Sequence, residues 1–223
     1  MKLSSPGHPQ SPTWLLLALL VALSGCSKRD PIVFNLERID ASGNAVTDTA
    51  PYEQAPWACV HDLRTNLTWE VKTVQPGLHG ADNTYTWFYP DQSDVYNRGD
   101  AGKPDGGSCT GSKCDTSGYV AAVNEAGLCG HRDWRVPTTE ELGSIINPSI
   151  RPPGPSLSTE FFPNTRSADY WTSTTYRFYA PGAWTWSFLH GLDRVDNKTE
   201  AKHIRLVRGT ASVRPEPPRG PKN

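Results

Sequence analysis

The sequence predicts an α+β domain in which strands and helices occupy separate stretches of the chain. Two stretches rich in β-forming residues, 57–62 and 66–73, come early. Two segments with helical spacing, 115–130 and 136–147, lie in the middle. Three stretches with the alternation typical of strands close the domain, at residues 169–176, 183–190 and 202–209.

The early pair of stretches predicts a hairpin that turns at residues 63–65. Trp69 and Val71 are two positions apart and therefore share one face of its second strand. Upstream, residues 31–39 predict an opening strand. Downstream, the run YTWFY at 85–89 predicts an aromatic strand or a buried loop.

Both helices have capping signals. In the first, Asp115 or Thr116 can cap the start, and Gly127 stands where a glycine ends many helices. In the second, Thr138 and Glu141 form a Thr-x-x-Glu capping box, which satisfies orphan amides at the start of the helix. Its apolar stripe continues to the end of the segment, where Pro148 stops the helix; the stripe comprises Leu142, Ile145 and Ile146.

The closing strands carry a group of aromatic residues. GLDRVDN at 191–197 predicts the turn between the second and third strands. Trp184 and Trp186 share one face of a strand, and such a face is usually core. The alternative is an exposed platform on which sugar rings stack, made of Tyr170, Trp171, Trp184 and Trp186.

Residues 1–25 predict a targeting segment. Lys2 supplies a positive charge, and the apolar run at 14–23 has the length of a signal-peptide core, too short to span a bilayer. The run ends in Leu-Ser-Gly-Cys, which resembles the bacterial lipobox and predicts acylation of Cys26. Ser27 follows, and in a Gram-negative cell this residue points to the outer membrane. The alternative is an ordinary secretory signal with a chance cysteine.

The remaining chain divides into a tether, one domain and a tail. Without residues 1–25 it has 21 basic and 23 acidic side chains, a formal net charge of −2, which does not favour nucleic-acid binding. Residues 26–30 predict a short tether, and residues 31–210 a single domain. Residues 211–223 are proline-rich and poor in apolar side chains, so we expect a disordered tail.

Four cysteines besides Cys26 predict two disulfides in an exported chain. Three pairings are possible. We favour a short staple within a glycine-rich loop, Cys109–Cys114, and a long bridge, Cys59–Cys129. Zinc binding is the alternative, but paired C-x-x-C spacing is missing.

The loop around the short staple is rich in Asp, Gly and Ser. Its acids could gather on a calcium ion, because carboxylate and carbonyl oxygens are the ligands calcium prefers. The spacing is irregular, unlike that of an EF-hand, and a soluble acidic loop is the alternative. The calcium hypothesis names Asp91, Asp94, Asp100 and Asp105.

Catalytic patterns are incomplete in this sequence. His131-Arg132-Asp133 starts like a kinase catalytic loop, but Thr138 stands where the metal-binding Asn belongs. A Gly-x-Ser-x-Gly nucleophile motif is also missing. Glu140 and Glu141 are adjacent on a helix start and point to different sides. We therefore expect a protein without enzymatic activity and without a required cofactor.

The motifs WACVHDLRTNLTWEVKT, YVAAVNEAGLCGHRDWRVPTTEEL, YWTST and IRLVR, in this order, resemble a family of bacterial exported domains. The family is named for the C-terminal domain of a Legionella collagen-like adhesin, and the resemblance covers roughly residues 31–209. It implies a C-type-lectin-like fold related to the formylglycine-generating enzymes. Such a domain has two helices, a small antiparallel sheet whose first and last strands meet, and long loops. In this light residues 131–142 shape the fold: Trp134 and Val136 pack, and Arg135 bonds to loop carbonyls or to an acid.

The resemblance implies a lipid-anchored binding or adhesion module for a glycan or another envelope component. The family's named member is an adhesin for sulfated polysaccharides, but no binding residue of the family can be matched to a position here. The rival is a structural envelope lipoprotein that acts through protein contacts. An enzyme of the formylglycine-generating type is disfavoured, because it needs a late cysteine pair and the last cysteine here is Cys129.

Overall fold

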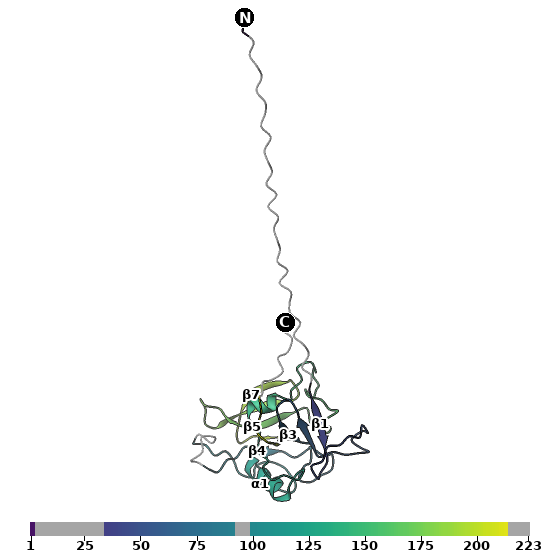
Figure 1. The fold of residues 1–223 in the computed structure, drawn as a ribbon. Helices are drawn as coiled ribbons and strands as arrows, with labels where there is room; N and C mark the ends of the chain where they lie inside the picture. Colours follow the sequence, from purple (N-terminus) through teal and green to yellow (C-terminus); the bar gives the residue numbers. More distant parts are fainter. Residues whose placement is uncertain (3–33, 92–98, 214–223) are drawn as a thin grey trace. The chain divides into compact units, whose positions relative to one another are not determined.

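The computed structural model describes residues 1–2, 34–91 and 99–213. The described residues after Pro31 belong to one compact unit (Figure 1). Cys26, the tether, residues 3–25 of the predicted signal segment and nearly all of the predicted tail lie outside the described residues. Within the described part, no helix is both long and apolar enough to cross a membrane.

The described elements are mostly short strands, with two helices in the middle of the chain, as an α+β domain requires. They are β1 (Leu36–Ile39), β2 (Cys59–Asp62), β3 (Leu67–Glu70), β4 (Tyr85–Thr86), α1 (Thr116–Ala126), α2 (Thr139–Gly143), β5 (Asp169–Thr175), β6 (Gly182–Ser187), β7 (Leu192–Asn197), β8 (Ala201–Lys202) and β9 (Val207–Arg208).

The largest sheet joins the two ends of the domain. Its order is β1-β2-β3-β9 and every neighbouring pair is antiparallel. β2 and β3 form the predicted hairpin, whose turn is held by the Asp62 carboxylate and the Thr65 hydroxyl, 2.7 Å apart. The first and last strands share this sheet but do not pair, because β9 pairs with β3 and β1 lies at the other edge.

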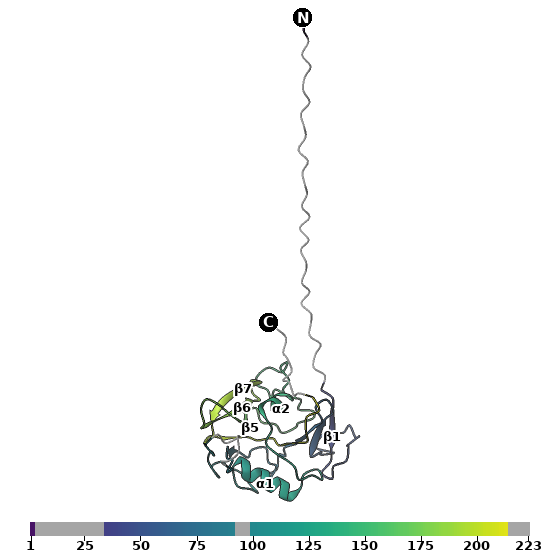
Figure 2. The same cartoon turned by 60° about the vertical axis from the view of Figure 1, so that its left-hand side comes forward.

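A three-stranded antiparallel sheet, β5-β6-β7, forms a second layer, and α2 lies beside β5 and β6 (Figure 2). The turn predicted at 191–197 is wrong, because Leu192–Asn197 is strand β7. The chain reverses just before it, where Gly191 adopts φ 67° and its amide donates to the Ser187 carbonyl. β7 is a largely solvent-facing edge strand, so its sequence lacks apolar alternation.

The strand predicted at 202–209 is broken in two. β8 pairs with β4, and β9 pairs with β3. Between them the Leu206 amide donates to the Glu70 carboxylate, 3.0 Å away, where a regular ladder would use a backbone carbonyl. The side chain of Arg205 is fully buried there.

The helices begin at the predicted caps. Asp115 accepts from the Gly118 amide, and Gly127, with φ 79°, ends α1. Thr138 and Glu141 form the complete capping box of α2. α2 is shorter than predicted because it ends at Gly143, and Ser144 caps it. The predicted stripe is nevertheless buried, since Leu142, Ile145 and Ile146 all belong to the core.

A buried polar network lies at the centre of the main sheet. One oxygen of the Glu70 carboxylate accepts from Lys72 Nζ at 2.9 Å, from the Tyr119 hydroxyl, and is 2.8 Å from His79 Nδ1. Lys72 also donates to the Tyr119 hydroxyl at 2.7 Å. Glu70, Lys72 and Tyr119 are almost completely buried. The network therefore connects β3 to α1 and, through the Leu206 amide, to the end of the chain.

Both predicted disulfides form. Cys59–Cys129 connects β2 to the loop after α1 and spans 70 residues of sequence, whereas Cys109–Cys114 closes a short loop before α1. The first is buried in the core beside Trp134. It connects the segment before residue 131 to β2.

Candidate functional site

Residues 131–142, which lead from α1 into α2, are hydrogen-bonded to the last strand. The amide and carbonyl of Arg135 bond to the carbonyl and amide of Val207, each at 2.9 Å. The Arg135 guanidinium makes two bonds of 2.6 Å to the Glu141 carboxylate and one of 3.1 Å to the Gly209 carbonyl. Both roles expected of Arg135 are thus confirmed, and Trp134 is buried as expected.

The same segment forms one wall of a cavity of about 460 Å³. This volume lies within the range of small-molecule sites, roughly 300–1,000 Å³. The other walls come from the segment after β4, from the first turns of α1, and from β5. The lining residues are Trp87, Phe88, Tyr89, Thr116, Ser117, Val120, Arg135, Val136, Thr138, Glu141 and Ser173.

The apolar wall is the aromatic run that follows β4. Trp87 is anchored by its indole, which donates to the Thr172 carbonyl at 2.9 Å. Phe88 is anchored by its backbone, because the Thr116 hydroxyl accepts from its amide and donates to its carbonyl. Phe88 and Tyr89 are partly exposed, and Val120 continues this wall on α1. The cavity therefore presents aromatic surface held by bonds to α1 and β5.

The polar wall consists of hydroxyl groups and one ion pair. Ser173 donates to the Pro137 carbonyl at 3.2 Å, which leaves its oxygen able to accept. The Thr138 oxygen accepts from the Glu141 amide, so its hydroxyl hydrogen remains a donor. Arg135 and Glu141 are the charged residues among the described lining, and their charges cancel.

The four aromatic residues predicted as a stacking platform do not form one. Tyr170, Trp171 and Trp186 are buried, each less than 10 % exposed. The indoles of Trp171 and Trp186 are satisfied inside the domain, by the carbonyls of Tyr85 and Thr139. Both faces of their sheet are covered by packed elements. The alternation of residues along the strands therefore could not tell core residues from surface residues.

Trp184, the fourth of these residues, is half-buried and belongs to a different aromatic group. Its ring meets Tyr176 edge to face, and Tyr176 meets Phe178 in the same way. Phe178 and Tyr179, in the β5–β6 connection, are 72 % and 51 % exposed. An exposed aromatic surface therefore exists on the closing strands, but at a turn and without the predicted residues other than Trp184.

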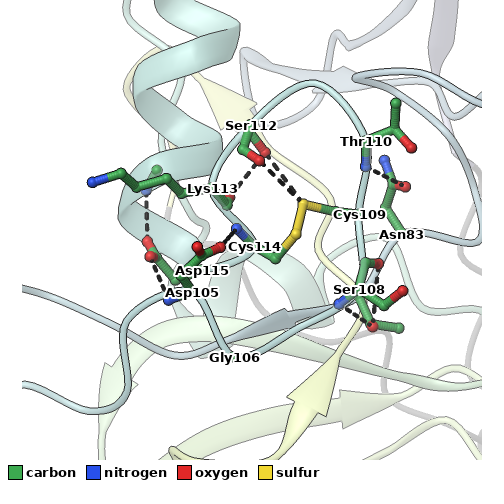
Figure 3. Close-up of a disulfide and its surroundings, with 12 residues drawn as sticks. Asn83, Asp105, Gly106, Ser108, Cys109, Thr110, Ser112, Lys113, Cys114 and Asp115 are labelled. Carbon is green, nitrogen blue, oxygen red and sulfur yellow. Dashed lines mark hydrogen bonds between the residues drawn. A yellow bond between two sulfur atoms is a disulfide. The ribbon is translucent and has the colours of Figure 1, made fainter.

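Two of the acids proposed for calcium bind backbone amides of the loop itself. The Asp105 carboxylate accepts from the Cys114 amide at 2.6 Å, and the Asp105 amide donates to Asp115 (Figure 3). The Asp100 carboxylate accepts from the Gly102 amide at 2.8 Å. Asp94 lies outside the described residues, whereas Asp91 lies within them. The described ranges contain no group of three His, Cys, Asp or Glu side chains that could hold a metal ion.

The sequence does not predict the cavity, although it predicts most of its parts. YTWFY predicts a strand or a buried loop, and VPTTEEL predicts a helix start. The high aromatic content of YTWFY, next to a loop without periodicity, was the available signal for a binding surface. Nothing in the sequence indicated that residues 87–89, 117–120 and 135–141 would meet.

The described residues thus form an α+β domain of short antiparallel strands that contains a cavity with an aromatic wall. Residues 58–208, about two thirds of the chain, match the model of the family described as the Lcl C-terminal domain, and the chain belongs to this family. The family assignment makes it an adhesin-related, exported or envelope domain. Neither the curated proteins nor the solved structures give a significant match.

Proposed function

We propose that this protein is a non-catalytic binding or adhesion module that takes a glycan into the cavity between α1, α2 and the segment 87–89. The single observation that carries the proposal is the cavity wall. Aromatic surface lies on one side and hydroxyl groups on the other, the combination that suits the apolar face and the polar edge of a sugar ring. A C-type-lectin-like ancestry accords with two helices beside small antiparallel sheets.

The proposal includes attachment to the envelope through a lipid on Cys26, with residues 26–30 as a tether and the outer membrane as the destination in a Gram-negative cell. The lipobox-like Leu-Ser-Gly-Cys and the preceding apolar run support it. A diacylglycerol with an additional amide-linked chain buries enough methylene groups for stable anchoring. No cofactor is part of the proposal.

Lipid attachment predicts that Cys26→Ala abolishes incorporation of labelled palmitate and moves the protein from the membrane fraction to the soluble fraction. The neighbouring substitution Ser27→Ala is the control and should keep the label. Equal labelling of the Cys26→Ala protein and the wild type, or no labelling of the wild type, would contradict the lipoprotein proposal.

Glycan binding is tested with the full chain in detergent on an array that holds neutral and sulfated glycans, with calcium and again with a chelator. Val120→Trp places an indole in the cavity, whereas Ala121→Trp places the same group on the exposed side of α1. We expect saturable binding by the wild type and by Ala121→Trp, and at least tenfold weaker binding by Val120→Trp. Ser117→Trp, from the same wall, gives a second test should Val120→Trp melt at a lower temperature.

Four outcomes separate the alternatives. Equal binding by Val120→Trp and the wild type would overturn the cavity as the site. Loss of binding in Phe178→Ala/Tyr179→Ala alone would place the ligand on the exposed aromatic turn. A blank array would favour the structural lipoprotein, for which that turn is a surface suited to protein contacts. Glycan binding that is lost in chelator would support the calcium hypothesis for Asp91, Asp94, Asp100 and Asp105.

A further inference from the structure

We infer that the cavity selects an uncharged sugar ring and rejects sulfated or carboxylated ones, and that the Arg135–Glu141 pair sets this selectivity. The inference rests on the proposed function and names the ligand class for the same site. It differs from what the family resemblance implies, which is a sulfated polysaccharide. The balance of charges in a partly enclosed cavity carries this selectivity.

The only cation among the described lining residues is already matched. Two guanidinium nitrogens of Arg135 each lie 2.6 Å from an oxygen of the Glu141 carboxylate, a bidentate arrangement. Bidentate Arg–carboxylate pairs are among the strongest charge-assisted bonds in proteins. An incoming sulfate would have to compete with this carboxylate for the same guanidinium.

Neither partner can turn away without breaking a further hydrogen bond within the domain. Besides binding Arg135, Glu141 accepts from the Thr138 amide at 2.9 Å as half of the capping box of α2. Arg135 also donates to the Gly209 carbonyl at 3.1 Å. The side chain of Glu141 is 9 % exposed, so its charge is poorly screened by water. A bound anion would therefore find the guanidinium charge already balanced by a carboxylate that is held in place.

The rest of the lining favours a neutral ring. Phe88, Tyr89 and Val120 offer apolar surface for the C–H face of a sugar, and the hydroxyl groups of Thr138 and Ser173 can bond to its hydroxyls. An uncharged ring needs no counter-charge from the protein and leaves the ion pair undisturbed. Burial of an unpaired anion here would be costly.

The test compares pairs of array glycans with the same backbone, one neutral and one sulfated, on the full chain and on Glu141→Gln. Gln is accepted at this position of a capping box, so α2 keeps its start, while Arg135 loses its counter-charge. We expect the wild type to bind the neutral member at least about tenfold more tightly. Glu141→Gln should reverse or abolish this preference, and its binding of the sulfated member should weaken as salt rises.

The failure of this inference differs from the failure of the proposed function. Wild-type preference for the sulfated member, lost in Val120→Trp, would overturn the neutral-ligand inference and leave the cavity as the binding site. Binding unaffected by Val120→Trp or Ser117→Trp would overturn the site itself. Unchanged selectivity in a Glu141→Gln protein with wild-type melting temperature would show that the ion pair does not set the ligand class.

Discussion

Replacement of Glu70 by Gln is expected to lower the free energy of unfolding by about 3–5 kcal/mol, because it removes one partner of a buried ion pair. The Glu70 carboxylate binds Lys72, Tyr119 and the Leu206 amide, and it is fully buried. Gln would leave the Lys72 ammonium buried beside a neutral group. Urea or thermal unfolding of the purified variant measures the loss.

The control is the double replacement Glu70→Gln/Lys72→Met, which removes both charges together. Replacement of a whole buried ion pair by uncharged groups is often far less costly than loss of one partner. The double variant should therefore be more stable than Glu70→Gln alone. A single variant within about 1 kcal/mol of the wild type would mean that the network contributes little to folding.

The same network predicts loss of stability in acid. Burial alone raises the pKa of the Glu70 carboxyl, but the Lys72 ammonium, the His79 ring and the Tyr119 hydroxyl outweigh burial and hold that pKa well below its ordinary value. The unfolded chain therefore binds this proton more readily than the folded one. The contribution of Glu70 is present above the unfolded pKa of about 4.3 and is lost as the pH falls below it. Glu70→Gln should show a flatter acid limb in unfolding experiments.

Replacement of Cys59 and Cys129 by Ala is expected to destabilise the domain by about 4 kcal/mol. The disulfide spans 70 residues, and cross-links that close long loops restrict the unfolded chain most. The bridge also lies in the core, where both cysteines are almost completely buried. Equilibrium unfolding of the purified double variant, compared with the oxidised wild type, measures the effect.

Cys109→Ala/Cys114→Ala is the matched control, because it removes a bridge that spans only five residues. The same loop-closure relation gives about 2 kcal/mol for such a short loop. Its residues lie in a partly exposed turn that also holds Asp105 and Asp115 (Figure 3). Equal losses of unfolding free energy in the two double variants would contradict the prediction that the long bridge stabilises the domain more than the short one.

Local features of the fold could be predicted from the sequence. The hairpin around residue 64, the cap at Asp115 and the box at Thr138 depend on neighbours within a few positions, and all three form. The family could also be recognised, because its motifs are contiguous stretches.

Features that depend on distant contacts could not be predicted. β7 is polar because it lies at an edge, and the break before Val207 exists because Glu70, far away in the sequence, binds the Leu206 amide. The burial of Trp171 and Trp186 depends on elements that cover both faces of their sheet. The cavity is assembled from four such separate segments.

The pairing of β9 with β3 has a consequence for the order of events in synthesis. Residues 205–208 supply the partner strand for β3, the amide that binds Glu70 and the backbone that holds Arg135. While a ribosome is still making this segment, the main sheet lacks an edge strand. The Glu70 carboxylate then lacks one of its donors, the Leu206 amide. We therefore expect the main sheet to be completed only after residues 205–208 have been made.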